Sequence, residues 1–174
     1  HLAGGMLHSC VTNGTPERGG KAWCWGGNAG GQLGDGTTTT RLKPTPVPGL
    51  EDVAEIAAGD LHTCARNADG TVFCWGQNYT GQLGDGTTTS RLSPRLVPGL
   101  GDVVELALYL RHSCARINDG TVRCWGQNND GQLGDGTTTN RYTPTPVPGL
   151  TNVAEIAAGG RHMCARINDG TVRC

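Results

Sequence analysis

The sequence repeats itself with a period of fifty residues. From the second unit onward the register is strict: His62, His112 and His162 correspond. The first unit carries four extra residues between its cysteines, so His8 precedes His62 by 54 residues. A period of this size is typical of propellers and solenoids. We divide the chain into three repeats and a partial fourth: 1–54, 55–104, 105–154 and 155–174. The first repeat is truncated at its N-terminus and has a hairpin insertion.

Each unit is predicted to form four short antiparallel strands. The apolar run 52–59 suits a buried inner strand, and the β-prone runs 62–66 and 71–76 flank an Asp-Gly turn. Prolines in 91–100 indicate an edge strand or an extended connection. Interior glycines disfavour helices, and the chain has 29 glycines. We therefore predict an all-β chain of propeller blades, three full and one partial, the last a hairpin only. A β-solenoid is the alternative, although its coils are usually shorter.

The cysteines fall in pairs within the predicted hairpins. If Asn67 to Gly70 forms the turn, Cys64 lies directly opposite Cys74, close enough for a disulfide. The alternative is zinc held by His62, Cys64 and Cys74, but the short Cys-x-x-Cys spacing of zinc sites is absent. The spacing favours disulfides, and hence an oxidising compartment. The predicted pairs are Cys10 with Cys24, Cys64 with Cys74, Cys114 with Cys124, and Cys164 with Cys174.

The charge balance gives no reason to expect nucleic acid or a membrane as partner. The net charge is −1, and the basic residues form no run. No apolar stretch is long enough to span a bilayer. Because the sequence starts at His1, we expect a mature or excised piece from which a leader has been removed.

The repeat resembles that of the regulator of chromosome condensation family. The features that carry the resemblance are the AAG-x-x-H segment at 57–62, the Asp-Gly turn, the WG-x-N step at 75–78 and the GQLG loop at 81–84. The resemblance implies a β-propeller, usually of seven four-stranded blades. Members range from nuclear exchange factors for small GTPases to secreted bacterial proteins, including a propeller that inhibits β-lactamase. The paired cysteines and the DGTTT extension resemble the secreted bacterial branch.

The sequence departs from this pattern in two ways. Tyr109 stands where the other units have Gly59 and Gly159, which predicts altered packing there. In addition, three full units and a hairpin cannot close a normal ring. The sequence stops at Cys174, where Trp-Gly would follow in the pattern. We therefore expect either a longer parent protein or an assembly of several chains.

The residues that recur in every unit are predicted to be structural. One histidine per unit suits a hydrogen bond between blades better than catalysis. The recurring tryptophans suit packing, with a sugar site as the alternative. Calcium at the aspartates of the DGTTT loops is a weaker alternative, because one aspartate per loop is far from the acidic ladder of a calcium site. No catalytic residues, metal or cofactor are predicted. The structural set comprises His8, His62, His112, His162, Trp25, Trp75 and Trp125.

Function is expected where the units differ, on loops of a rigid scaffold. Tyrosine and arginine are favoured anchors at protein interfaces. The candidates for partner contact are therefore Tyr79, Tyr109, Arg111 and Tyr142. We predict a non-enzymatic, disulfide-stapled module, secreted or at the cell surface, that binds a protein partner. The alternatives are a subunit that assembles with other copies of itself into a ring or extracellular filament, and a carbohydrate-binding propeller.

Overall fold

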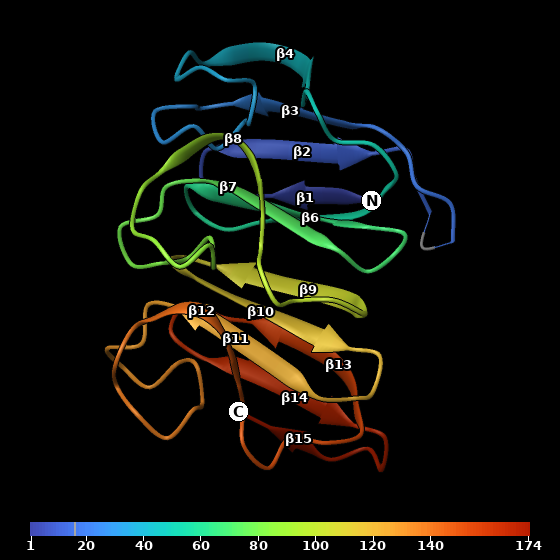
Figure 1. Cartoon of the computed structure of the whole chain (residues 1–174), viewed down its shortest axis with the longest axis vertical. Helices are drawn as coiled ribbons and strands as arrows, with labels where there is room; N and C mark the ends of the chain where they lie inside the picture. Colours follow the sequence, from blue (N-terminus) through green and yellow to red (C-terminus); the bar gives the residue numbers. More distant parts are fainter. Residues whose placement is uncertain (16) are drawn as a thin grey trace.

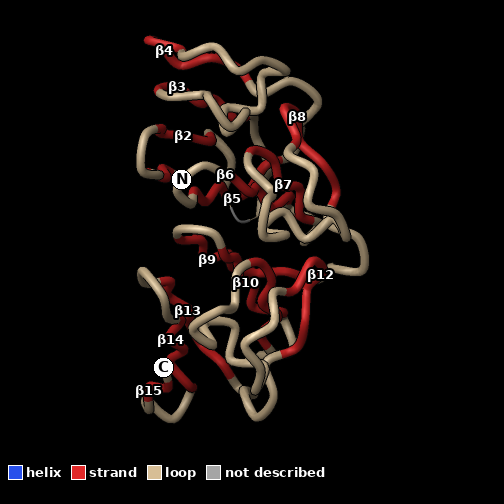
Figure 2. Tube along the Cα trace, turned by 90° about the vertical axis from the view of Figure 1, so that its left-hand side faces the viewer, coloured by secondary structure: helices blue, strands red, loops and turns tan. Residues whose placement is uncertain are grey.

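The computed structural model describes residues 1–15 and 17–174, and within them every regular element is a β-strand (Figure 2). Pro16, in the hairpin insertion, lies outside the described residues. The strands are β1 (Leu2–Gly4), β2 (His8–Thr12), β3 (Ala22–Gly26), β4 (Arg41–Pro46), β5 (Val53–Ala58), β6 (His62–Asn67), β7 (Val72–Gly76), β8 (Arg91–Leu96), β9 (Val103–Tyr109), β10 (His112–Ile117), β11 (Val122–Gly126), β12 (Arg141–Pro146), β13 (Val153–Ala158), β14 (Met163–Ile167) and β15 (Val172–Arg173).

In the described part of the chain the strands form four separate antiparallel sheets, which are the blades of a propeller. The first three have the orders β1-β2-β3-β4, β5-β6-β7-β8 and β9-β10-β11-β12, and the fourth is β13-β14-β15. The prediction of an all-β fold with four-stranded blades is therefore confirmed. The first and fourth sheets lie at opposite ends of the long axis, so the blades form an open arc (Figure 1).

The hairpin between the second and third strands of each blade has the predicted register. Cys64 is directly opposite Cys74 on β6 and β7, and Gly70 in the turn has a φ of 82° that favours glycine. In the first blade Cys10 still faces Cys24 despite the insertion. All four predicted pairs are disulfides, each with its Cα atoms 4.1 Å apart.

The inner strand of the second unit, β5 at Val53–Ala58, lies within the apolar run 52–59 where it was predicted. The division of the chain into repeats stays a prediction. The fourth unit contains β13 as well as the hairpin, so it is a three-stranded sheet rather than a hairpin only.

Tyr109 changes the turn before the histidine of the third blade. In the second blade Gly59 packs directly against the ring of His62, where an added Cβ would collide with the imidazole. In the third blade β9 continues to Tyr109, which pairs with His112, and the next residue, Leu110, has a φ of 35°. The predicted alteration of local packing is therefore present.

Among the described residues the hydrophobic core consists of three clusters, one between each pair of successive blades. Between the first two blades, for example, Leu33 and Cys24 pack with Ile56 and Trp75. The two remaining clusters repeat this arrangement further along the arc. Each blade is therefore stabilised mainly by its neighbours, as in other repeat proteins.

Candidate functional site

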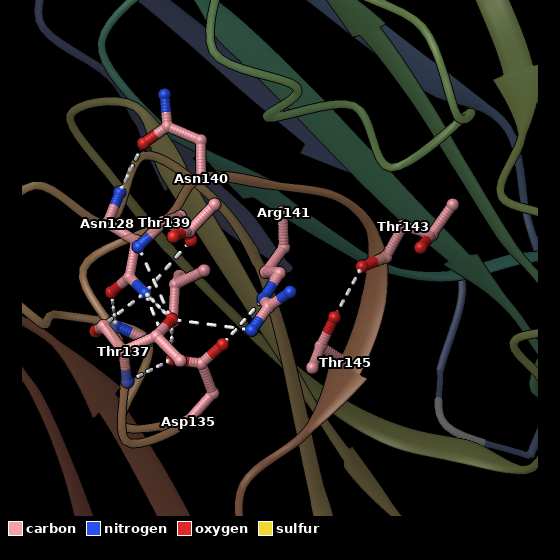
Figure 3. A network of polar contacts seen from close by, with 9 residues as sticks. Asn128, Asp135, Thr137, Thr139, Asn140, Arg141, Thr143 and Thr145 are labelled. Carbon is pink, nitrogen blue, oxygen red and sulfur yellow. Dashed lines mark hydrogen bonds and ion pairs between the residues drawn. The ribbon is translucent and has the colours of Figure 1, made fainter.

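The loop WG-x-N-x-x-GQLGDGTTT is held together by one buried asparagine in each unit. In the third blade, Asn128 Nδ2 donates to Asp135 Oδ1 at 3.0 Å and to the carbonyls of Thr137 and Thr139 at 3.0 and 3.1 Å (Figure 3). Its Oδ1 accepts from the backbone N–H of Leu133 at 3.0 Å. The same bonds recur at Asn28 and Asn78. The asparagine therefore takes the place of backbone pairing in a loop that has no strands.

The aspartate of this loop is also fully engaged inside the loop. Asp135 accepts hydrogen bonds from the N–H and hydroxyl of Thr137, and its other oxygen lies 2.6 Å from Arg141 Nε (Figure 3). Burial alone would raise the pKa of Asp135, but the bonds from Thr137 and Arg141 outweigh it and hold the pKa at about 2. The carboxylate of Asp135 therefore makes its hydrogen bonds within the loop itself, which supports a structural role for this motif.

The described residues contain no cluster built for a metal ion. Within 1–15 and 17–174, no three His, Cys, Asp or Glu side chains gather closely enough to share one. No helix in this part of the chain could span a membrane.

The loops of the first and second blades each also contact the tryptophan of the next blade. Trp75 is fully buried, and its Nε1 donates to the carbonyl of Gln32 at 2.9 Å. The same carbonyl accepts from the hydroxyl of Thr63 at 2.8 Å, and Thr63 Oγ1 lies 2.8 Å from His8 Nε2. One chain of hydrogen bonds therefore joins histidine, hydroxyl, carbonyl and indole across the junction.

The next junction repeats this chain with a serine. Trp125 Nε1 and Ser113 Oγ both donate to the carbonyl of Gln82 at 2.9 Å, and His62 Nε2 lies 2.9 Å from Ser113 Oγ. These contacts support the prediction that the recurring histidines and tryptophans are structural. Sequence reasoning missed the hydroxyl residues, because Thr63 and Ser113 differ in type and stand at an unremarkable position beside the cysteine.

The third junction lacks this hydroxyl. The corresponding residue of the fourth unit is Met163, whose side chain has no hydroxyl group to join the carbonyl and the histidine. Neither ring nitrogen of the fully buried His112 makes a hydrogen bond of good geometry to another described residue. The junction between the third and fourth units is therefore built differently from the other two.

The buried histidines predict a loss of stability in mild acid. Burial lowers the pKa of His8 and His112 to about 4 and, with His112 and His8 beside it, that of His62 to about 3. An unfolded histidine has a pKa of about 6.5, so below this value the unfolded chain binds more protons than the folded one. The stability from neutral histidine is therefore complete above pH 6.5 and declines as the pH falls toward 4.

We expect the free energy of unfolding, measured by urea denaturation, to be lower at pH 4.5 than at pH 7 by a few kcal/mol. The reason is that a pKa difference of one unit between the folded and unfolded states is worth about 1.4 kcal/mol. His62→Gln should reduce this pH dependence. The matched change His162→Gln, at an exposed position, should leave the pH dependence of the free energy of unfolding unchanged. An equal midpoint at both pH values would contradict the burial of neutral histidines.

The structure places the four candidate contact residues at the same end of the second and third blades. Tyr79 is 69% exposed, and Tyr109, Tyr142 and Arg111 are also exposed. The loop after Tyr79 links two of the others: Thr80 Oγ1 donates to the carbonyl of Arg111 at 3.3 Å, and Gly81 packs against Tyr142. Their role in binding stays a prediction.

The arrangement defines a β-propeller repeat protein whose shared residues hold the blades together. The family model described as "Regulator of chromosome condensation (RCC1) repeat" matches residues 19–66, 69–115 and 119–166, and a second model of the same description matches 53–82 and 103–132. These matches cover well over half of the sequence. The chain belongs to the RCC1 repeat family.

Known proteins agree with this assignment. The chain is 40% identical over 67 residues to the E3 ubiquitin-protein ligase HERC2 of Homo sapiens, a match that covers 37% of this chain and 1% of the ligase. Prp20p from Saccharomyces cerevisiae, studied with its binding to Gsp1p and histones, superposes with a TM-score of 0.83 at 24% identity over 99% of this chain and 44% of that one. The ectodomain of the Arabidopsis thaliana receptor kinase ACR4 gives a TM-score of 0.59 at 24% identity over 99% and 51%. The chain spans about half or less of each relative's own length.

Proposed function

We propose that this chain is a non-catalytic, disulfide-stapled propeller module that binds a protein partner outside the cell. The observation that carries the proposal is the exposed face formed by Tyr79, Tyr109, Arg111 and Tyr142, which we call the tyrosine face. Tyr79 stands on the loop that Asn78 and Asp85 hold together, and Tyr109 and Tyr142 stand on the strands β9 and β12. Rigid aromatic and arginine side chains are the usual anchors of protein interfaces.

Two further observations support the proposal. The four disulfides are typical of proteins from oxidising compartments. Among the proteins of similar fold, Prp20p binds Gsp1p and histones, and the ACR4 propeller is an ectodomain. Trp75 and Trp125 are fully buried, so these two tryptophans do not line a sugar site.

Assembly between copies is the second candidate function, and the first blade favours it. Leu2, Met6, Leu7 and Leu42 are exposed on this blade, and Leu42 is 91% exposed. Exposed large apolar side chains of this kind would be buried if copies of the chain associated through this blade. Light scattering tests this candidate, because a stable monomer of 18.1 kDa would contradict it.

A display experiment tests the tyrosine face directly. Peptides selected from a random phage library on the immobilised chain should bind the triple variant Tyr79→Ala, Arg111→Ala, Tyr142→Ala at least about tenfold more weakly, since anchor residues contribute more than about 1 kcal/mol each. The matched control is Leu42→Ala, at the position in the first blade that corresponds to Tyr142. Full affinity in the triple variant would overturn the proposal.

A further inference from the structure

A hollow lies between the second and third blades, beside the hairpin turn of the second blade. Both blades have four strands, and residues of both form its wall. Its volume is about 280 Å³, which lies just below the range of about 300 to 1,000 Å³ for small-molecule sites. This volume suits a single side chain. The polar and small residues that line the hollow are Arg66, Ala68, Asp69, Gly70, Asp102 and Asn118.

Two carboxylates face the hollow from different blades. Asp69 stands in the hairpin turn, where its Oδ1 accepts hydrogen bonds from the hydroxyl and the N–H of Thr71. These bonds lower the pKa of Asp69, so its carboxylate is charged at neutral pH. Gly70 packs against the next blade, because an added Cβ would lie 3.0 Å from the Cα of Asp102. Asp69 Oδ2 and the carboxylate of Asp102 accept no hydrogen bond from a described residue.

Arg66 adds a hydrogen-bond donor to the wall. It is only 6% exposed, and it donates through Nε to Glu55 at 3.0 Å and through Nη1 to the carbonyl of Asn67 at 3.3 Å. Its third nitrogen, Nη2, makes no hydrogen bond to another residue that the structure describes. Because Glu55 balances the charge of Arg66, the hollow keeps the negative charge of Asp69 and Asp102, and Nη2 is left to donate to a neutral oxygen.

The other two junctions differ at this place. At the first, the hairpin insertion forms a β-bridge to Val53. At the third, Asn118 stands where the second junction has Ala68, and Asn152 stands where it has Asp102. The third junction therefore has a longer side chain and one carboxylate fewer. The residues that form the hollow are thus specific to one junction, unlike the structural residues that recur in every unit.

We propose that this hollow binds a lysine side chain of a protein partner. The ammonium group lies between Asp69 and Asp102, and a backbone carbonyl beside the lysine accepts a hydrogen bond from Arg66 Nη2. An ammonium suits the site because it is compact and has three donors, so it can contact two carboxylates at once. The methylene groups of the lysine lie along Ala68 and Val104, which also line the hollow.

The lysine site lies at the opposite end of the blades from the tyrosine face. Strand β10 begins at His112, directly after Arg111 of the tyrosine face. It ends at Ile117, directly before Asn118 of the hollow. The lysine site therefore uses none of the residues of the tyrosine face, and the two proposals can be tested separately.

The test uses N-acetyl-lysine N-methylamide, which has the side chain and two backbone carbonyls. Titrated into the isotope-labelled chain at low ionic strength, it should shift the NMR signals of the Gly70, Val103 and Asn118 amides in a saturable way. A Kd of about 1 mM is expected for so small a ligand. The amide of Arg111 should not shift. The norleucine analogue, which lacks the ammonium group, should bind at least about fivefold more weakly, since both charge contacts are lost.

Two variants introduce the residues of the third junction into the second. Asp102→Asn, with the residue type of Asn152, should weaken lysine binding about threefold, because one carboxylate is removed. Ala68→Asn, with the residue type of Asn118, should weaken it about fivefold, because the longer side chain occupies the hollow. Asp119→Asn is the matched control: Asp119 has the same turn position in the next blade but does not line the hollow, so the affinity should be unchanged.

Three results would overturn the proposal. These are no saturable shift, equal binding of the norleucine analogue, and unchanged affinity in both Asp102→Asn and Ala68→Asn. Shifts confined to Arg111 and its neighbours would also overturn it, because the lysine would then bind at the tyrosine face. Thermal melting shows whether the variants are folded, and the norleucine comparison on the unchanged chain is decisive without them.

Discussion

Trp75→Ala is expected to lower the free energy of unfolding by about 3 to 5 kcal/mol, the range for large aromatic side chains removed from a core. Trp75 is fully buried in the cluster between the first two blades, and its indole covers Gly34. The substitution also removes one of the two hydrogen bonds to the carbonyl of Gln32. Urea denaturation followed by fluorescence of the remaining tryptophans measures the loss.

Trp25→Ala is the matched control for this prediction. Trp25 has the same position in the first blade, but it is only half-buried because no described blade packs against it. Trp25→Ala should therefore lower the free energy of unfolding distinctly less than Trp75→Ala does. Equal losses would mean that the tryptophans act within their own blades, which would contradict the junction described above.

Removing the disulfide of the third blade is expected to lower stability by about 3 kcal/mol. The bridge between Cys114 and Cys124 closes a loop with a sequence separation of 10, and constraining a loop of this size in the unfolded chain contributes on that order. Both sulfurs are buried, so the double variant Cys114→Ala, Cys124→Ala also loses packing. Urea midpoints at pH 7, without reductant, measure the difference.

The terminal bridge provides the comparison. Cys174 is exposed and Cys164 is only partly buried, so Cys164→Ala with Cys174→Ala should lose less packing than the internal pair. If the internal double variant is as stable as the unchanged chain, the bridge does not constrain the blade and the disulfide account of its stability is wrong.

The sequence was sufficient for the features that depend on neighbours along the chain. The hairpin register follows from the Asp-Gly turn, so the pairing of Cys64 with Cys74 could be predicted by counting residues. The fifty-residue period indicated blades, and Pro94 correctly indicated that β8 is an edge strand. These signals are local or repeated, and both kinds can be read from one sequence.

The contacts between blades could not be predicted in the same way. The carbonyl of Gln32 accepts hydrogen bonds from Thr63 Oγ1 and Trp75 Nε1, which are 31 and 43 residues further along the chain. The role of Glu55 was also missed. Its buried carboxylate accepts a hydrogen bond from Arg66 Nε at 3.0 Å and another from the backbone N–H of Leu106, in the next blade, at 3.2 Å. A carboxylate in an apolar strand becomes understandable only when the neighbouring strand is in place.

A count of free thiols tests our proposal that this chain is a disulfide-stapled module of an oxidising compartment. The chain is purified without reductant, denatured, treated with iodoacetamide and measured as an intact mass. None of the eight cysteines should be alkylated until a reductant is added, because all eight are paired in disulfides. Eight alkylated cysteines would contradict both the disulfides and the placement outside the cell.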